Sequence, residues 1–317
     1  MEKPTFDPGL TQQYTGALKR VINKDGQFNI RRKGGNWRDL HLYLFMINAS
    51  WFLFFGLIAA VFIMVNTAFA GIYMAIGIDH IKGTEAPTMG LRFLNAVFFS
   101  AHTLTTVGYG NMYPDGPLAN TMAALEAMTG LLGFAIATGL VFGRFSRPSA
   151  RIGFSKNVLI APYQDITSLQ FRLVNRRSNL IINLRARLLL MTVEYVGGRM
   201  QRKFTPLPLE RDEVLFLALT WTVVHPIDEN SPLYGKTAED LERLQAEVLV
   251  VISGFDDTFS QTVHSRYSYR YEDIKWGAKF APAFDVGQSG DLLIELNRVS
   301  AVEPAPLKKA LQEPGLP

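Results

Sequence analysis

Charged residues are missing from two long stretches of the chain. Residues 40–78 contain no Asp, Glu, Lys or Arg, and residues 116–143 contain only one, Glu126. A membrane-spanning helix needs about 20 mostly apolar residues, and both stretches are longer than that. A third uncharged stretch, residues 93–114, is apolar in its first half and polar in its second. The pattern therefore predicts two membrane helices with a different kind of element between them.

The first stretch is too long for one straight span, so we divide it. Residues 36–46 begin with Asn, Trp, Arg and Asp, which is typical of a short amphipathic helix at the inner membrane interface. We expect the outer helix over residues 47–78. The second stretch predicts an inner helix over residues 117–145, after a tight turn of Pro, Asp and Gly.

The basic residues decide how often the chain crosses the membrane. Only Lys82 and Arg92 lie between residues 79 and 115, whereas Lys and Arg gather on the far sides of both predicted helices. These flanking residues are Lys19, Arg20, Lys24, Arg31, Arg32, Lys33, Arg38, Arg144, Arg147, Arg151 and Lys156. Short flanks rich in Lys and Arg stay cytoplasmic, so residues 1–35 and the chain after the inner helix lie on the same side. The middle stretch must then enter the membrane and return, as a pore helix over residues 93–104 and a loop.

The loop carries the sequence Thr-Val-Gly-Tyr-Gly at residues 106–110. Backbone that alternates between left- and right-handed conformations points successive carbonyl groups the same way, and glycine adopts the left-handed one without a Cβ clash. The preceding helix also directs the negative end of its dipole toward the membrane centre, where it favours a cation. In potassium channels, four loops of this sequence surround the ion. This resemblance to potassium-channel filters implies a K⁺ filter built from Thr106, Val107, Gly108, Tyr109 and Gly110.

The inner helix carries candidate residues for a gate. Phe134, Thr138 and Phe142 recur every four residues and fall within an arc of about 80°. They can line one face of a pore, and four Phe142 rings at the inner mouth could close it by dewetting. Gly130 is either a bending point or a packing position, and the sequence leaves both readings open.

Glu126 is the only charged residue in the inner span. A carboxyl group inside a membrane is a functional candidate by default. It lies in the outer part of the predicted helix, level with the pore helix rather than with the cavity. We expect it to form hydrogen bonds behind the filter, to a Thr or to His102, rather than to bind the ion.

After residue 148 the pattern changes to alternating apolar and polar positions. The apolar positions are Leu169, Phe171 and Leu173; Ile182, Leu184, Ala186 and Leu188; and Tyr267, Tyr269 and Tyr271. This alternation, with Gly, Pro and Asn turns between the runs, predicts an antiparallel β-sandwich over residues 148–303. One helix interrupts it, with Thr237 as N-cap and Asp240 three residues later. We expect the Pro-rich residues 304–317 to be disordered.

Composition excludes several classes of function. Without Cys, the chain has no disulfides, thiol catalysis or zinc–thiolate sites. The five His residues are scattered, with His225 expected in a structural turn, and no nucleophile motif or phosphate-binding glycine loop is present, so we expect neither an enzyme nor a cofactor. The net charge of +4 lies largely beside the predicted helices, which suits anionic lipids better than nucleic acid. The first forty residues are polar, so no cleavable signal peptide is expected.

Four stretches together resemble the prokaryotic inward-rectifier potassium channels. They are the TVGYG filter, RFSRPSA at residues 144–150, WTVVHPIDENSPLYG at residues 221–235 and QTVHSRYSY at residues 261–269. The resemblance implies a homotetramer in the inner (plasma) membrane, with immunoglobulin-like cytoplasmic domains that extend the pore inward. It also implies gating that depends on anionic lipid. By motif match the lipid-binding residues are Arg144, Arg147 and Arg151, which topology alone would also explain.

Two positions depart from the family pattern. His102 stands where members often carry a pore-helix Glu, so support of the filter by that carboxylate does not carry over to this chain. The candidate supporting residues here are His102 and Glu126. Phe134 stands where strong rectifiers carry an acidic residue or Asn on the inner helix. The resemblance therefore does not extend to strong voltage-dependent block by polyamines.

These observations favour an inward-rectifier-like potassium channel, gated where the inner helices cross. The alternative from another class is a membrane-anchored immunoglobulin-like binding or sensor protein with a non-conducting loop. The filter sequence favours the channel, because an anchor needs no cage of backbone carbonyl groups.

Overall fold

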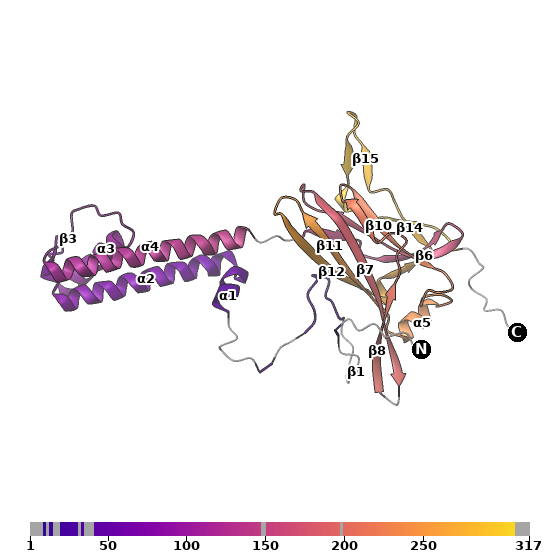
Figure 1. Cartoon of the computed structure of the whole chain (residues 1–317), viewed down its shortest axis with the longest axis horizontal. Coiled ribbons are helices and arrows are strands. Elements are labelled where there is room, and N and C mark those ends of the chain that lie inside the picture. Colours follow the sequence, from indigo (N-terminus) through magenta and orange to yellow (C-terminus); the bar gives the residue numbers. More distant parts are fainter. Residues whose placement is uncertain are drawn as a thin grey trace. The chain divides into compact units, whose positions relative to one another are not determined.

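The computed structural model of the chain describes residues 9–10, 13–14, 20–30, 33–34, 41–146, 150–196 and 199–307. The chain forms two compact units (Figure 1). Lys33–Arg147 form a helical unit, and Met1–Arg32 join Pro148–Pro317 in a β unit. The long apolar helices belong to the first unit and the large sheets to the second.

The helical unit begins with two helices separated by a sharp break. α1 spans Leu42–Asn48 and α2 spans Trp51–Ile76. Between them, Ala49 and Ser50 have extended backbone. The Ser50 hydroxyl accepts a hydrogen bond from the Leu53 amide (3.3 Å), which caps the start of α2.

This break corrects two expected boundaries. The outer helix was expected over residues 47–78, but α2 is shorter at both ends, because Ser50 caps its start and Gly77 (φ 113°) ends it. The expected interfacial helix, residues 36–46, corresponds to α1, which continues to residue 48. Residues 36–40 of that expected helix lie outside the described residues.

The expected pore helix is α3, Met89–Leu104, which begins four residues before the predicted start at residue 93. The Thr88 side chain caps it through a hydrogen bond of 3.4 Å to the backbone. Arg92 lies in its first turn, where its Nε donates to the Ala86 carbonyl (3.1 Å). The predicted start was too late because it was placed directly after the charged residue Arg92. In the structure Arg92 lies in the first turn of the helix.

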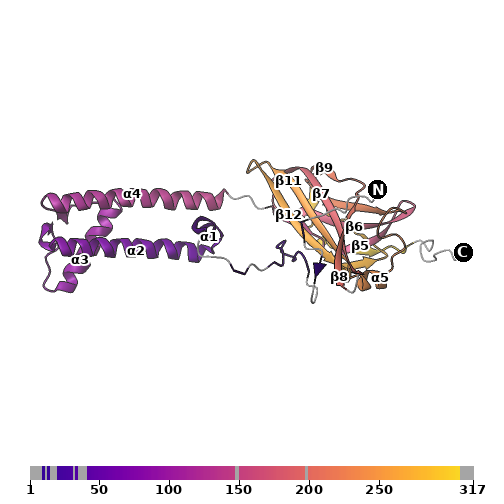
Figure 2. The same ribbon diagram turned by 60° about the horizontal axis from the view of Figure 1, so that its bottom comes forward.

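The expected inner helix corresponds to α4, Pro117–Phe145. Within the described residues, α2 and α4 are the two helices that are long and apolar enough to cross a membrane. Figure 2 shows them side by side, with α3 against both at one end. The short strands β2 (Ile81–Lys82) and β3 (Tyr113–Pro114) pair there as well. An apolar core joins these elements, formed by Ala70, Tyr73, Ile78, Ile81, Ala96, Phe99 and Ala119.

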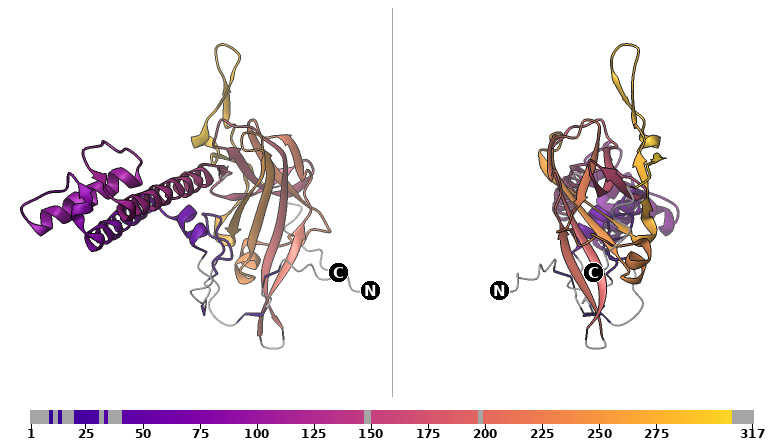
Figure 3. Two further views of the ribbon diagram at one scale, coloured as in Figure 1. Left: turned by 60° about the vertical axis from the view of Figure 1, so that its left-hand side comes forward. Right: turned by 90° about the vertical axis from the view of Figure 1, so that its right-hand side faces the viewer.

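The β unit contains two large sheets (Figure 3). One has the order β1-β8-β7-β11-β12 with β9 beside β7, and the other has the order β10-β6-β5-β13 with β4 beside β6. Two small ladders, β14–β17 and β15–β16, complete the unit. The strands are β1 (Gln13–Tyr14), β4 (Ile152–Phe154), β5 (Val158–Tyr163), β6 (Ile166–Asn175), β7 (Ile181–Val196), β8 (Arg199–Leu207), β9 (Glu213–Phe216), β10 (Thr220–Ile227), β11 (Glu247–Asp256), β12 (Gln261–Arg270), β13 (Ile274–Trp276), β14 (Ala278–Phe280), β15 (Phe284–Val286), β16 (Leu292–Ile294) and β17 (Val302–Pro304). Among the strand pairs described, β5 with β13 is parallel, which departs from the fully antiparallel sandwich we expected.

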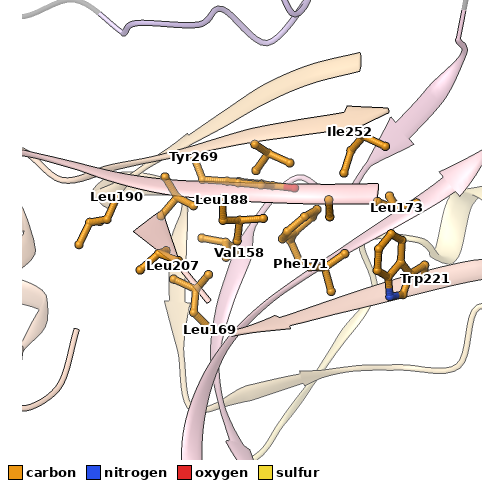
Figure 4. Close-up of a cluster of buried hydrophobic side chains, with 14 of the residues drawn as sticks. Val158, Leu169, Phe171, Leu173, Leu188, Leu190, Leu207, Trp221, Ile252 and Tyr269 are labelled. Atoms are coloured by element: carbon orange, nitrogen blue, oxygen red, sulfur yellow. The ribbon is translucent and has the colours of Figure 1, made fainter. Parts of the chain in front are cut away.

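Side chains from both sheets meet in one apolar core (Figure 4). On β6, Leu169, Phe171 and Leu173 are completely buried, as the alternation predicted. The facing sheet contributes Leu188, Leu190, Leu207, Ile252 and Tyr269. Burial of alternate side chains from two facing sheets explains why a period of two marks this half of the chain.

The alternation slips by one position near the start of β7. Ile181 is buried (1% exposed), whereas Ile182, which was predicted to face the core, is only half-buried. Asn183 has a φ of 51°, and the pairing with β11 shifts register between Ser253 and Phe255. A bulge of this kind moves the side chains that precede it to the opposite face of the sheet.

The helix within the β unit is α5, Ala238–Arg243, and its predicted cap is confirmed. Thr237 accepts a hydrogen bond from the Asp240 amide, and the Asp240 carboxylate accepts one from the Thr237 amide. His225 lies within strand β10 rather than in the expected turn. Its ring bridges the Pro208 carbonyl (2.5 Å) and the Ser231 hydroxyl (2.8 Å). Burial lowers the pKa of His225, which suits a neutral structural cross-link.

The disordered tail was expected over residues 304–317, and this predicted start is too early. Pro304 belongs to β17, which pairs with β14. Ala305 is buried, and its amide donates to the Gly277 carbonyl (2.8 Å). The ordered sandwich therefore includes these residues, because they add an edge ladder to it. Residues 308–317 lie outside the described part of the chain.

Residues 20–30 precede the first membrane helix but pack on the β unit. The Val21 amide donates to both carboxylate oxygens of Glu247 (3.0 and 3.1 Å). The Ser268 hydroxyl donates to the Ile22 carbonyl (2.7 Å). Segments from before α1 and after α4 therefore share one compact unit.

Candidate functional site

The backbone of residues 106–110 has a repeating conformation. φ is positive at Thr106 (58°), Gly108 (52°) and Gly110 (80°), and at neither residue between them. Left-handed conformations at alternate positions are what a row of carbonyl groups on one side requires. Glycine was expected at such positions, but Thr106 was not, because a β-branched residue rarely adopts positive φ.

The amide groups of this segment are tied to the end of α3. The Val107 amide donates to the His102 carbonyl (2.9 Å), and the Gly108 amide shares the same acceptor (3.3 Å). The Thr106 amide donates to the Thr103 carbonyl (3.0 Å). Within the described residues, no donor reaches the carbonyl oxygens of residues 106–109. The amide groups of Thr106, Val107 and Gly108 are thus paired while these carbonyl groups are left unpaired, which is the arrangement that a backbone cation site needs.

His102 contacts residues 106–110, the expected filter segment, in two ways. Its carbonyl oxygen accepts the two amide hydrogen bonds described above, and its ring meets the Tyr109 ring at 89° with the centroids 4.9 Å apart. Edge-to-face packing of this kind restricts the orientation of both rings. His102 is therefore placed where it can hold the filter segment from behind.

Glu126 contacts other residues than those expected. Its carboxyl group is fully buried and bonds the hydroxyl groups of Tyr73 (2.6 Å) and Ser100, rather than a Thr or His102. Ser100 and His102 lie two residues apart on α3, so their side chains point about 200° apart around the helix. Glu126 therefore meets the face of α3 opposite to the one that carries His102.

Asn66, Tyr73 and Ser100 complete this polar group and were not identified from the sequence. The sequence of α2 did contain an indication of a buried polar group. Asn66 is the only amide side chain of this helix, and Tyr73 follows two turns later. Nothing in the sequence alone tells which residue each of them contacts, because the partners come from three different helices.

Gly130 lies where α4 touches the end of α3. A Cβ atom at Gly130 would lie 1.9 Å from the Leu104 carbonyl oxygen, so the two backbones are in direct contact. α4 continues without interruption through this position. Close packing therefore explains the glycine, while bending at Gly130 stays a prediction.

The predicted gate residues lie on an uncovered part of α4. Phe134 is 74% exposed and Phe142 is 70% exposed in the single chain, and Thr138 is exposed as well. Tyr109 of the filter segment is 74% exposed too. Both the expected filter and the expected gate are therefore uncovered in the single chain.

The predicted lipid-binding residues have different surroundings. The Arg144 guanidinium donates to the carbonyl groups of Met46 and Ala49 (2.7 Å for the latter), and it lies 4.3 Å above the Trp51 ring. Arg144 therefore joins α4 to the end of α1 and the start of α2. Arg151 is exposed at the start of the β unit, and Arg147 lies outside the described residues.

Within the parts of the chain described above, no three His, Asp or Glu residues are grouped closely enough to hold a metal ion. The candidate site is thus the backbone of residues 106–110, with the side chains that hold it.

Comparison with known proteins covers both units. A family model for the inward rectifier potassium channel C-terminal domain matches residues 152–313, and one for ion channels matches residues 50–147. The inward rectifier potassium channel Kirbac3.1 of Paramagnetospirillum magnetotacticum is 37% identical over 294 residues, covering 90% of this chain and 98% of that protein. ATP-sensitive inward rectifier potassium channel 12 of Bos taurus and of Homo sapiens are each 25% identical, over 87% of this chain and 70% and 69% of those proteins. A solved structure of Spo0M, a sporulation control protein from Bacillus subtilis, aligns over 41% of this chain and 50% of its own with 11% identity and a TM-score of 0.23, too low to support an argument.

Proposed function

The chain belongs to the inward rectifier potassium channel family, and we propose that it conducts K⁺ through a filter formed by the backbone carbonyls of residues 106–110. One observation carries this proposal. The amides of Val107 and Gly108 are bound to the end of α3, while the carbonyls beside them have no donor within the described residues. In an enclosed pore these carbonyl groups would be withdrawn from water and would need a partner, which a dehydrated K⁺ ion would supply. Family membership also favours a channel over an anchored binding or sensor protein.

The filter is completed by four copies of the chain. One chain supplies one wall of a pore, and its Val107 and Tyr109 are 51% and 74% exposed. Most residues of α2 and α4 are also exposed in the single chain. In a homotetramer, neighbouring copies and lipid would cover these surfaces, and four filter segments would enclose the ion.

Both ends of the chain lie in the cytoplasm, and the channel resides in the inner membrane. Residues 20–30 precede the first span and pack on the domain that follows the second, as the Val21–Glu247 and Ile22–Ser268 hydrogen bonds show. Two segments that pack together must lie on one side of the membrane. The basic residues that flank both spans support the cytoplasmic side.

The gate lies at the inner end of α4. In a tetramer, the exposed Phe134, Thr138 and Phe142 would face a common axis, and Phe142 is the one nearest the inner end. Four apolar rings at a narrow mouth exclude water and thereby ions.

Anionic lipid modulates this gate in two ways. Arg151 is exposed and can meet lipid headgroups directly, as can Arg147 by its position in the sequence. Arg144 acts differently, because its guanidinium already bonds the end of α1. It would transmit a movement of the interfacial helix to the inner helix rather than bind a headgroup itself.

The test is ion flux from purified protein in liposomes. We expect Rb⁺ uptake driven by internal K⁺, which external K⁺ competes with and Na⁺ does not. The uptake should change when a polyanionic inositol lipid is added. Flux that does not distinguish K⁺ from Na⁺, or no flux in any lipid mixture, would contradict the proposed filter.

A further inference from the structure

A chain of hydrogen bonds connects the three helices behind the filter. Tyr73 of α2 donates to Oε2 of Glu126 on α4 (2.6 Å). Oε1 of Glu126 bonds the Ser100 hydroxyl of α3, and that same hydroxyl lies 3.0 Å from Oδ1 of Asn66 on α2. Asn66 Nδ2 donates to the Phe62 carbonyl (2.7 Å). All four side chains are buried, and those of Tyr73, Ser100 and Glu126 are fully so.

If Glu126 is ionised, these hydrogen bonds lack one hydrogen atom. The Ser100 hydroxyl has one hydrogen, yet it contacts both Glu126 Oε1 and Asn66 Oδ1. If the hydrogen points to Asn66, the contact with Glu126 is a hydrogen bond only when the carboxyl group donates. If it points to Glu126 instead, lone pairs of Ser100 and Asn66 face each other at 3.0 Å.

Rotating the Asn66 amide does not remove the conflict. Its nitrogen could then donate to Ser100, but its oxygen would lie where Nδ2 now is, 2.7 Å from the Phe62 carbonyl oxygen. Neither of the ion pairs described in the helical unit includes Glu126, and the side chains that face it are Tyr73 and Ser100. A carboxylate buried without a cation is costly. A neutral carboxyl group satisfies every contact, because it donates to Ser100 and accepts from Tyr73.

We propose that Glu126 is a proton-carrying positioning residue whose neutral carboxyl group joins Tyr73 to Ser100 and thereby fixes α3 between α2 and α4. The proposal rests on the proposed conduction path, because α3 carries at its end the His102 carbonyl that holds the filter amides. A shift of α3 would move this acceptor. Gln reproduces the donor and acceptor pattern of a neutral Glu, whereas Leu has a similar size and reproduces neither.

The proton is tested by infrared spectroscopy of the full-length protein in liposomes at neutral pH with K⁺. The difference between the parent and Glu126→Gln isolates this one carboxyl group. We expect the C=O band of a protonated carboxylic acid in that difference, with a shift in D₂O. A pair of carboxylate bands in its place would overturn the proposal. This measurement needs no conduction, so it decides the matter even if the protein carries no ions.

The positioning role is tested by Rb⁺ uptake and by the preference for Rb⁺ over Na⁺. Glu126→Gln should retain both, and Glu126→Leu should lose uptake or preference although it assembles. If the Leu variant does not assemble, Tyr73→Phe takes its place, since it removes one hydroxyl group, and a reduced preference is expected. A parent-like Leu or Phe variant, or a Gln variant that assembles but loses preference, would overturn the role. A parent protein without uptake would instead contradict the proposed function.

Discussion

At the scale of the residue, the filter segment adopts a conformation that its side chains do not favour. Thr106 has a φ of 58°, which costs a β-branched residue about 1–2 kcal/mol or more. Its amide bonds the Thr103 carbonyl, and the next two amides bond the His102 carbonyl. These bonds from the helix end offset the cost. The surroundings of the segment therefore impose its geometry, as is common where backbone strain serves a function.

Gly108 is the residue at which this geometry can be tested most directly. Its φ of 52° favours glycine, so Gly108→Ala should cost about 1–2 kcal/mol in each subunit. We expect reduced Rb⁺ uptake or a reduced preference for Rb⁺ over Na⁺ in liposomes. Gly133→Ala is the matched control, because Gly133 is helical and a Cβ there meets nothing within 4 Å in the chain. Unchanged selectivity in Gly108→Ala would contradict the assigned filter geometry.

At the scale of the element, three helices are held together by close backbone contact and by polar groups. α3 touches α4 at Gly130, and the Glu126 network joins both to α2. At the other end, Arg144 joins α4 to the break between α1 and α2. α4 is therefore connected both to α3 and to the end of α1, which suits an element that would move in the proposed gating.

Gly130→Ala tests the contact between α3 and α4. The added Cβ would lie 1.9 Å from the Leu104 carbonyl oxygen, so the end of α3 must shift. We expect a loss of stability of about 1–3 kcal/mol, seen as a lower midpoint of thermal unfolding of the purified protein. Gly139→Ala serves as control, because its Cβ meets nothing within 4 Å. A stable Gly130→Ala variant with altered gating would indicate a bending role instead.

Arg144→Lys separates charge from geometry at the helix break. Lys keeps the positive charge but cannot bond both the Met46 and Ala49 carbonyls while stacking on Trp51. We expect Arg144→Lys to lose most of the lipid response of Rb⁺ uptake, and Arg151→Lys to retain it, because Arg151 is exposed. A parent-like response in both variants would show that charge alone matters at residue 144.

At the scale of the whole molecule, the proposed ion path requires four copies of the chain. The filter segment and the inner-mouth residue Phe142 are both uncovered in one chain. We expect four Phe142 rings to close the mouth, so Phe142→Ala should raise the single-channel open probability at a fixed lipid composition. Phe145→Ala, an equally apolar change three residues later, is the control. Equal open probabilities in the parent and the Phe142 variant would place the constriction elsewhere.

The sequence alone determined the order of the main parts. The spans, the left-handed glycines of residues 106–110 and the sandwich are visible because each depends on a local rule: an apolar run long enough for a membrane, glycine at left-handed positions, and alternation along a half-buried strand. Local rules also located the cap at Thr237. They failed at boundaries where one polar contact decides, as at Ser50 and Thr88.

Only the tertiary structure decided which distant residues meet. Glu126 bonds Tyr73 and Ser100, Arg144 bonds the end of α1, and residues 20–30 pack against the Glu247 carboxylate. The bulge at Asn183 likewise depends on the register with β11. These contacts follow from the directions in which separate helices and strands pack. Periodicity within one segment carries no information about its partner, so the polar partners behind the filter could not be assigned before the helices were placed together.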